Sequence, residues 1–228
     1  MSKIKLECCA NSVESAINGQ AGGAHRIELC ANLELGGTTP SAAAICMASE
    51  VLEVDLFVLI RPRAGNFCYS ELEMEQIIQD IDFCKQVGCD GVVVGALDKN
   101  FNIDIEKTKR MVKAAGLMSV TFNRAFDEVK DSKKALMDVI STGCSSVLTS
   151  GRQTSVKEGI ENIKQLYDLS DSEISIIAGG ALDVVSALQL YAHGLKEFHM
   201  SATDKKQDPP RRTQIELVEN FLENFEEL

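Results

Sequence analysis

The chain has 228 residues, 45% of them hydrophobic and 25% charged, which fits one globular domain with a well-filled core. Its formal net charge of −11 excludes nucleic-acid binding as the main function, because backbone phosphates need clustered Lys and Arg. No apolar run approaches the roughly eighteen residues of a membrane span, and the first residues lack the apolar core of a signal peptide. We therefore expect no membrane partner and a cytoplasmic location.

Short apolar segments alternate with longer segments at helical period along the chain, which is typical of βαβ units and a parallel sheet. The pattern predicts eight strands: Ile4–Cys9, Arg26–Cys30, Leu56–Arg61, Gly91–Gly95, Ser119–Asn123, Ser146–Thr149, Ile174–Ala178 and Glu197–His199. Recurring glycine corners between helices and strands favour an α/β fold of the (β/α)8 TIM barrel type. No Gly-x-Gly-x-x-Gly opens the first helix, which disfavours a dinucleotide-binding sheet.

Several helix starts carry capping signals. Asn11 and Ser70 each precede a glutamate by three residues, which is the spacing of a capping box. Thr39 precedes Pro40, a pairing typical of the first helical position. These signals predict helices that begin near residues 12, 40 and 71.

The character of the chain changes after the eighth strand. Residues 1–203 form the predicted barrel, and residues 204–228 form a linker with Pro209-Pro210 and an extra C-terminal helix. One face of that helix is apolar, so we expect it to pack on the barrel or on a second subunit. An acidic interaction surface is the alternative. The apolar positions are Ile215, Val218, Phe221, Leu222 and Phe225.

The first two strands share a Glu-x-Cys pattern, Glu7 with Cys9 and Glu28 with Cys30. Side chains alternate along a strand, so each pair faces one side, and burial of the glutamates favours the barrel interior. Neighbouring strands lie about 4.8 Å apart, so the two thiolates could hold Cu(I), a soft ion. The alternative is that both thiols fill a barrel layer. The chain has eight cysteines and no Cys-x-x-Cys, which indicates reduced thiols.

Arg61 ends the third strand, at the end of the barrel where enzymes of this fold place their sites. Its planar guanidinium suits a carboxylate or phosphate ligand. An internal salt bridge with Glu7 or Glu28 is the alternative, and the two interpretations are compatible.

The fifth strand leads into the segment Thr-Phe-Asn-Arg-Ala-Phe-Asp at residues 121–127. Asn123 suits substrate orientation better than proton transfer, because its amide can donate and accept hydrogen bonds but does not titrate. Arg124 and Asp127 are catalytic candidates. The alternative is that they pair with each other and brace the loop.

The last three strands end in small and hydroxyl residues, among them Ser150, Gly179, Gly180 and Ser201. Such residues at these strands are typical of the phosphate site of barrel enzymes, where backbone N–H groups surround an anion. With Arg61 they form the predicted anion-binding set.

His199 is the strongest candidate for proton transfer, because His25 and His193 lie at corners on the opposite face. A structural histidine is the alternative.

Taken together, the motifs SVESAINGQAGGAHRIELCANLELGGTTPS, IRPRAGNFCYS, GVVVGAL, TFNRAFD, LTSG, IAGGAL and FHMSA resemble the CutC family over residues 3–203. The resemblance implies a TIM barrel, cytoplasmic residence, often a homodimer, and a role in copper homeostasis. It also implies site residues. Cys9 and Cys30 match the cysteines usually proposed as Cu(I) ligands, and the polar positions at the family's barrel mouth match Glu7, Glu28, Arg61, Arg124, Asp127, Ser150 and His199.

Two positions depart from the family pattern. Asn123 stands where the family commonly has histidine, which removes a titratable group, and Ala181 stands where a third glycine is common. The sequence thus leads to two hypotheses: a copper homeostasis protein that binds Cu(I) through Cys9 and Cys30, or an enzyme acting on a small anionic metabolite. In the second, Arg61 and the glycine amides hold the anion, and glutamate or His199 exchanges protons.

Overall fold

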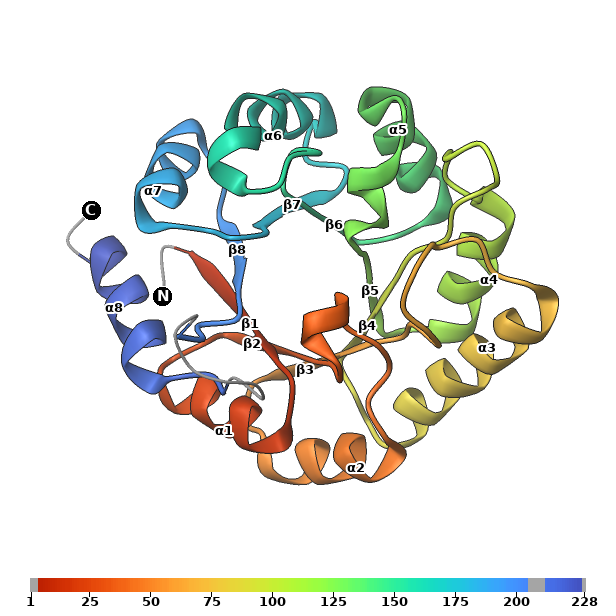
Figure 1. Cartoon of the computed structure of the whole chain (residues 1–228), viewed down its shortest axis with the longest axis horizontal. Helices are drawn as coiled ribbons and strands as arrows, with labels where there is room; N and C mark the ends of the chain where they lie inside the picture. The colour runs from red at the N-terminus through yellow and green to blue at the C-terminus, as the bar shows by residue number, and fades with distance from the viewer. Residues whose placement is uncertain (1–3, 205–211, 227–228) are drawn as a thin grey trace.

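In the computed structural model, which describes residues 4–204 and 212–226, eight parallel strands close into a barrel surrounded by helices (Figure 1). The strands pair in chain order and β8 pairs with β1, so the sheet has no free edge. This closed barrel confirms the predicted fold class.

Strands and helices alternate along the chain. In order they are β1 (Lys5–Ala10), α1 (Val13–Ala21), β2 (Arg26–Leu29), the 3-10 turn η1 (Leu33–Leu35), α2 (Ala42–Val51), β3 (Asp55–Leu59), α3 (Glu71–Gln86), β4 (Gly91–Val94), α4 (Ile105–Ala115), β5 (Ser119–Phe122), the 3-10 turn η2 (Arg124–Glu128), α5 (Ser132–Thr142), β6 (Ser146–Thr149), α6 (Val156–Ser170), β7 (Ser175–Gly179), α7 (Val184–His193), β8 (Glu197–Met200) and α8 (Ile215–Glu226).

The predicted strands are all present, whereas two helix starts were placed wrongly. The N-cap of α1 is Ser12 and not Asn11. The Ser12 side chain accepts a hydrogen bond from the backbone N of Ser15. The cap of α2 is Ser41, because Thr39 instead exchanges hydrogen bonds with the backbone of Arg61. The capping box that opens at Ser70 is confirmed.

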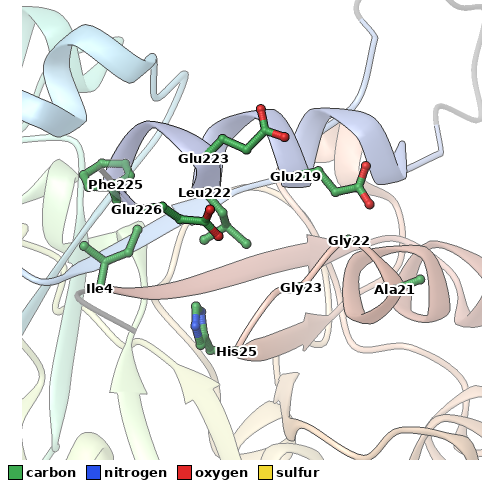
Figure 2. A pocket seen from close by; sticks show the side chains of 10 residues that line it. All are labelled: Ile4, Ala21, Gly22, Gly23, His25, Glu219, Leu222, Glu223, Phe225 and Glu226. Carbon is green, nitrogen blue, oxygen red and sulfur yellow. The ribbon is translucent and has the colours of Figure 1, made fainter. Parts of the chain in front are cut away.

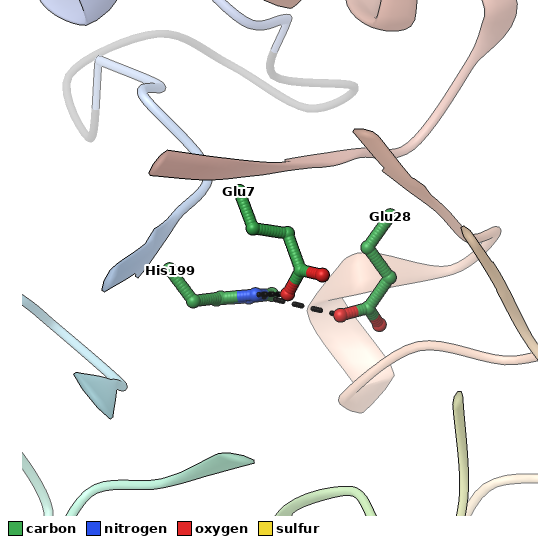
Figure 3. Close-up of side chains that lie close together, drawn as sticks. All are labelled: Glu7, Glu28 and His199. Carbon is green, nitrogen blue, oxygen red and sulfur yellow. Dashed lines mark hydrogen bonds and ion pairs between the residues drawn. The ribbon is translucent and has the colours of Figure 1, made fainter. Parts of the chain in front are cut away.

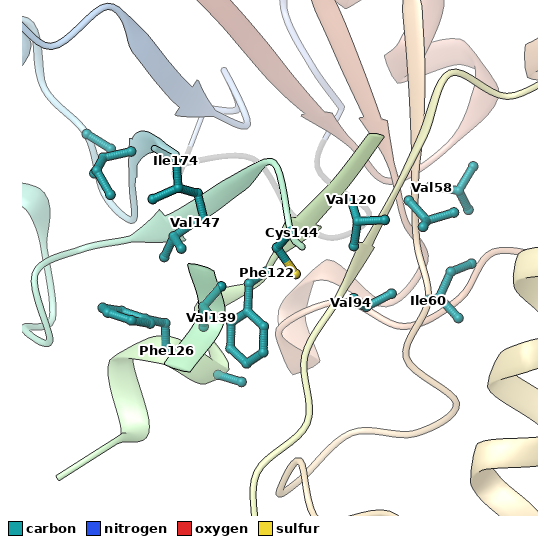
Figure 4. Close-up of a cluster of buried hydrophobic side chains, with 14 of the residues drawn as sticks. Val58, Ile60, Val94, Val120, Phe122, Phe126, Val139, Cys144, Val147 and Ile174 are labelled. Carbon is teal, nitrogen blue, oxygen red and sulfur yellow. The ribbon is translucent and has the colours of Figure 1, made fainter. Parts of the chain in front are cut away.

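Two apolar regions stabilise the barrel. The larger one lies between the strands and the helix ring, and part of it around β5 and β6 is shown in Figure 4. The smaller one lies inside the barrel and consists of Cys9, Cys30, Phe57, Leu59 and Val93. The barrel interior is therefore packed, as in other barrels of this size.

The C-terminal helix is present as α8 and lies between α7 and α1 (Figure 1). Phe221 and Phe225 on its apolar face contact Phe198 of β8, with ring centroids 6.2 and 5.7 Å apart. The predicted face thus packs on the barrel. Most of the predicted linker, including Pro209-Pro210, lies outside the described residues. Among the described helices, none has the length and apolar character that a membrane crossing requires.

A hollow of about 810 Å³ lies beside α8, between this helix, the end of α1 and the start of β1 (Figure 2). His25 lies in it and accepts a hydrogen bond from the backbone N of Leu6 through Nδ1, at 3.1 Å. Because His25 precedes β2, the hollow lies at the amino-terminal end of the strands. Active sites of TIM barrels form at the opposite end.

Candidate functional site

A smaller pocket of about 260 Å³ lies at the carboxyl ends of the strands, and we call it the mouth pocket. Eight of the predicted catalytic, anion-binding and metal-binding residues line it: Cys9, Glu28, Cys30, Arg61, Arg124, Gly180, His199 and Ser201. Although the hollow beside α8 is larger, this convergence identifies the mouth pocket as the candidate site.

Three titratable side chains from neighbouring strands meet beneath the mouth pocket (Figure 3). Glu7 of β1 pairs in register with His199 of β8, and Glu28 of β2 lies on the next strand. The Nδ1 atom of His199 lies 2.6 Å from Oε1 of Glu7 and 3.4 Å from Oε2 of Glu28. The Oε2 atom of Glu28 is buried and has no hydrogen-bond partner among the described residues.

These contacts move the pKa values of the three groups apart. Burial raises the pKa of Glu28 to about 8, although the charge of His199 acts in the opposite direction. Burial also acts to raise the pKa of Glu7, but the charges and hydrogen bonds of Arg26 and His199 lower it to about 2. Burial lowers the pKa of His199, but Glu7 and Glu28 outweigh this and raise it. At neutral pH Glu7 is thus ionised, whereas the neighbouring Glu28 largely keeps its proton.

Arg26 is a key residue of this cluster, and the sequence analysis gave it no role. Its Nε donates to Oε2 of Glu7 at 2.5 Å, and its NH2 donates to Glu197 at 3.0 Å. The guanidinium also lies over the ring of Phe57, 4.5 Å from the centroid. The signal was available, because Arg26 lies two residues before Glu28 and so faces the same side of β2.

The thiols of Cys9 and Cys30 lie beside this cluster, because Cys9 pairs in register with Glu28, and their sulfur atoms are 3.8 Å apart. Both side chains are buried, and Leu33 of η1 packs against them. The hydrogen bond with Cys30 and burial raise the pKa of Cys9 well above its usual value. The predicted approach of these two thiols is therefore present, with the sulfurs in contact.

Arg61 holds a loop and forms no salt bridge with Glu7 or Glu28, so that alternative was wrong. Its NH1 donates to the carbonyl groups of residues 35, 36 and 37, and its NH2 donates to Gly65 at 2.6 Å. Since Arg61 follows the end of β3, its side chain reaches the neighbouring β2–α2 loop (residues 30–41) rather than the barrel axis. Most of its donors are therefore occupied by backbone.

Arg124 and Asp127 pair across η2, as the bracing alternative predicted, with Nε of Arg124 2.8 Å from the carboxylate. The carboxylate also accepts from the backbone N of Ser150 and of Arg152 and from the hydroxyl of Thr149. Ser150 thus has its N and its hydroxyl engaged by Asp127, which leaves it no donor for an external anion. An internal carboxylate occupies the position where the sequence suggested an anion.

The two glycines of the predicted anion site make room for neighbouring side chains. A Cβ on Gly179 would lie 2.9 Å from Cβ of His199, and one on Gly180 would lie 3.1 Å from Cζ of Arg124. Ser201 lines the pocket, and its hydroxyl lies 3.3 Å from that of Thr203. Ala181 adopts a positive φ of 46°, a conformation in which glycine is less strained.

Asn123 caps η2, because its Oδ1 accepts from the backbone N of Ala125 at 2.9 Å. The residue is buried and lines the mouth pocket, so it fixes the turn that carries Arg124.

Sequence relatives match most of the chain. The model of the CutC family matches residues 4–204. A family protein CutC from Bacteroides fragilis is 43% identical over 206 residues, which cover 90% of this chain and 82% of the relative. A CutC protein from Xanthomonas campestris is also 43% identical, over 198 residues that cover 86% of this chain and 82% of the relative.

Solved structures agree with this match. CutC from Streptococcus agalactiae superposes with a TM-score of 0.82 at 30% identity, covering 87% of this chain and 98% of that one. QR15, described as an aldolase, superposes with a TM-score of 0.70 over 97% of this chain and 95% of its own, but at 14% identity it shows the fold alone. Because the family model spans the barrel and the relatives are 43% identical over 198 or more aligned residues, the chain belongs to the CutC family.

Proposed function

We propose that this protein takes part in copper homeostasis by binding Cu(I) as a cargo ion through Cys9 and Cys30. The observation that carries the proposal is the pair of buried thiols in contact, with sulfur atoms 3.8 Å apart at the mouth pocket. Thiolates are soft ligands that favour Cu(I). The S. agalactiae relative is itself named as a candidate copper homeostasis protein, which supports the same role here.

The spacing and surroundings of the Cys9 and Cys30 sulfurs suit one Cu(I) ion. A thiolate–metal bond of about 2.3 Å, as known for zinc, lets two sulfurs up to about 4.6 Å apart share one metal. The observed separation of 3.8 Å lies within that reach. Phe57, Leu59 and Val93 surround the sulfurs with apolar groups. Because burial and the contact with Cys30 keep the Cys9 thiol protonated, binding must release protons.

A titration of Cu(I) under anaerobic, reducing conditions against a chromogenic chelator tests this proposal. We expect one tight equivalent in the wild type, lost in the Cys9→Ser/Cys30→Ser variant. A Cys46→Ser/Cys68→Ser variant is the matched control. These two cysteines lie outside the interior cluster that contains Cys9 and Cys30, so their replacement should leave binding unchanged. Tight binding that survives in the Cys9→Ser/Cys30→Ser variant would rule out the thiol pair as the site.

The state of Glu28 favours a second candidate function, an enzyme acting on a small carboxylate or phosphate. A neutral carboxylic acid beside a histidine, both lining a pocket, is an arrangement that can exchange protons with a ligand. Arg124 rather than Arg61 would hold the anion, because its side chain lines the pocket and is 44% exposed. A thermal-shift screen of small carboxylates and phosphates tests this function. Arg124→Met should abolish the shift, and Arg63→Met, outside the pocket, should not.

A cytoplasmic location and a homodimer are part of the proposal. All eight cysteines are free thiols, as expected in a reducing compartment. Light scattering coupled to size-exclusion chromatography gives the oligomeric state directly.

A further inference from the structure

Three ligand atoms of two chemical kinds converge close to the thiol pair. They are a carboxylate oxygen from each of Glu7 and Glu28 and the Nδ1 atom of His199, and all lie within 4.8 Å of one another. Figure 3 shows the three side chains pointing toward a common centre from β1, β2 and β8. All three are buried, so the strands hold them in position without help from mobile loops.

One of these atoms lacks a hydrogen bond. Oε2 of Glu28 is buried, has no hydrogen-bond partner in the described structure, and points toward His199. A buried carboxylate oxygen without a donor is costly, and a bound cation would satisfy it. Arg26 binds the other oxygen of Glu7, which leaves Oε1 directed at the same centre.

The charges near the cluster suit a divalent ion. A bound metal would displace the proton of Glu28, after which Glu7, Glu28 and Glu197 supply three negative charges. Arg26, which pairs with the first and the last of them, supplies one positive charge. With His199 neutral as a ligand, the balance is −2. One imidazole and two carboxylates suit Mn²⁺, Fe²⁺ or Zn²⁺ and contain no soft donor for Cu(I).

The position also leaves room for a ligand of the metal. Glu28 and His199 line the mouth pocket, whereas Glu7 lies fully buried beneath it. A metal held by these three residues would have its remaining coordination positions toward the pocket. Three protein ligands with an open position are typical of catalytic metal sites.

We propose that Glu7, Glu28 and His199 form a binding site for one divalent cation of the Mn²⁺, Fe²⁺ and Zn²⁺ class, separate from the thiol pair. The site goes beyond Cu(I) binding, and either site can exist without the other.

Mn²⁺ is the probe of choice, because it prefers oxygen and nitrogen ligands and its free aqua ion gives a strong paramagnetic resonance signal. The titration is done on chelator-treated Cys9→Ser/Cys30→Ser protein, so that the thiols cannot contribute. We expect one equivalent of Mn²⁺ to be bound, and Glu28→Gln in this background to weaken the affinity at least tenfold. His199→Gln is a second variant with the same expected effect, and thermal unfolding checks that each variant is folded.

Exposed acidic residues are the competing explanation, because the chain carries a net charge of −11. Glu219→Gln/Glu223→Gln on α8 is the matched control, and it should leave the affinity unchanged. The proposal is overturned if the thiol-free protein binds no Mn²⁺, or if folded Glu28→Gln and His199→Gln variants bind it as well as their parent. Loss of Cu(I) binding alone leaves this result unaffected, so the two sites are tested separately.

Discussion

The two ends of the barrel interior use similar polar residues in opposite ways. At the amino-terminal end each charged group has fixed partners: Arg26 bonds Glu7 and Glu197, and Lys5 bonds Asp55. At the mouth, Glu28 has a carboxylate oxygen without a hydrogen bond. The thiols there contact each other.

This difference separates stability from function. Polar groups that hydrogen-bond or pair with one another fix the geometry of the barrel and have few donors or acceptors left for a ligand. Buried polar groups without a hydrogen-bond partner lower the stability of the protein unless a bound ligand supplies that partner. Glu7 belongs to both regions, because one of its oxygens binds Arg26 and the other binds His199.

Glu7→Gln should have the largest effect on stability. It removes the negative charge that pairs with the buried Arg26 guanidinium, and breaking a buried ion pair in this way costs about 3–5 kcal/mol. Urea unfolding at pH 7 measures the loss. Glu197→Gln is the control, because this carboxylate is 21% exposed and should cost less. Equal losses would show that the depth of the pair in the barrel does not matter.

Glu28 should make stability decrease as pH rises. Its pKa is about 8 in the folded protein against 4.5 for the unfolded chain. Between these values the unfolded chain releases the proton and the folded protein keeps it, so the free energy of unfolding falls. Each unit of pKa difference is worth about 1.36 kcal/mol. His199, whose pKa is raised, contributes in the same direction.

Unfolding of wild type and Glu28→Gln at pH 5, 6.5 and 8 measures this effect. The variant should lose the Glu28 part of the slope and some of the His199 part, because the charge of Glu28 helps to raise the pKa of His199, so its stability should fall less between pH 5 and 8 than that of the wild type. A slope that Glu28→Gln leaves unchanged would contradict the assignment of a neutral acid at the mouth.

Arg61→Met should have a moderate effect, because the carbonyl groups of the exposed residues Leu35 and Gly36 can bond to water instead, whereas that of the buried Gly37 cannot do so readily. We expect a loss of about 1–2 kcal/mol. We also expect faster alkylation of Cys30 by iodoacetamide, read by mass spectrometry, since Leu33 on the same loop packs against the interior cluster that contains the thiols. Arg63→Met is the control, because Arg63 bonds Glu73 and not the β2–α2 loop. If Cys30 reacts at the same rate in both variants, Arg61 does not hold the β2–α2 loop in place.

Ala181→Gly should have the smallest effect. Glycine adopts the positive φ of 46° without strain but adds freedom to the unfolded chain, so a gain of at most about 1 kcal/mol is expected. Thermal unfolding measures the sign. A clear loss would show that the Ala181 methyl group contributes packing at the pocket wall.

The sequence predicted the direction in which side chains point better than it predicted their partners. Strand alternation placed Glu7, Glu28 and the two cysteines inside the barrel, because that depends on local periodicity. The bond from Arg26 to Glu7 depends on the register between β1 and β2, which no local pattern encodes. The hydrogen bonds between Arg61 and the β2–α2 loop were equally unpredictable from the sequence. The carbonyl groups bound by Arg61 are set by backbone conformation, in which Gly36 and Gly37 have positive φ.

The stacked pair of Arg26 and Phe57 affects the route by which a ligand can reach and leave the barrel interior. Both side chains are buried inside the barrel, and they line the polar cavity at its amino-terminal end but not the mouth pocket. Because this stacked pair lies inside the barrel and lines only the amino-terminal cavity, we expect a ligand of the mouth pocket to enter and leave on the same side of the barrel. An incoming ligand and any protein that collects the outgoing one would then compete for the same face of the molecule.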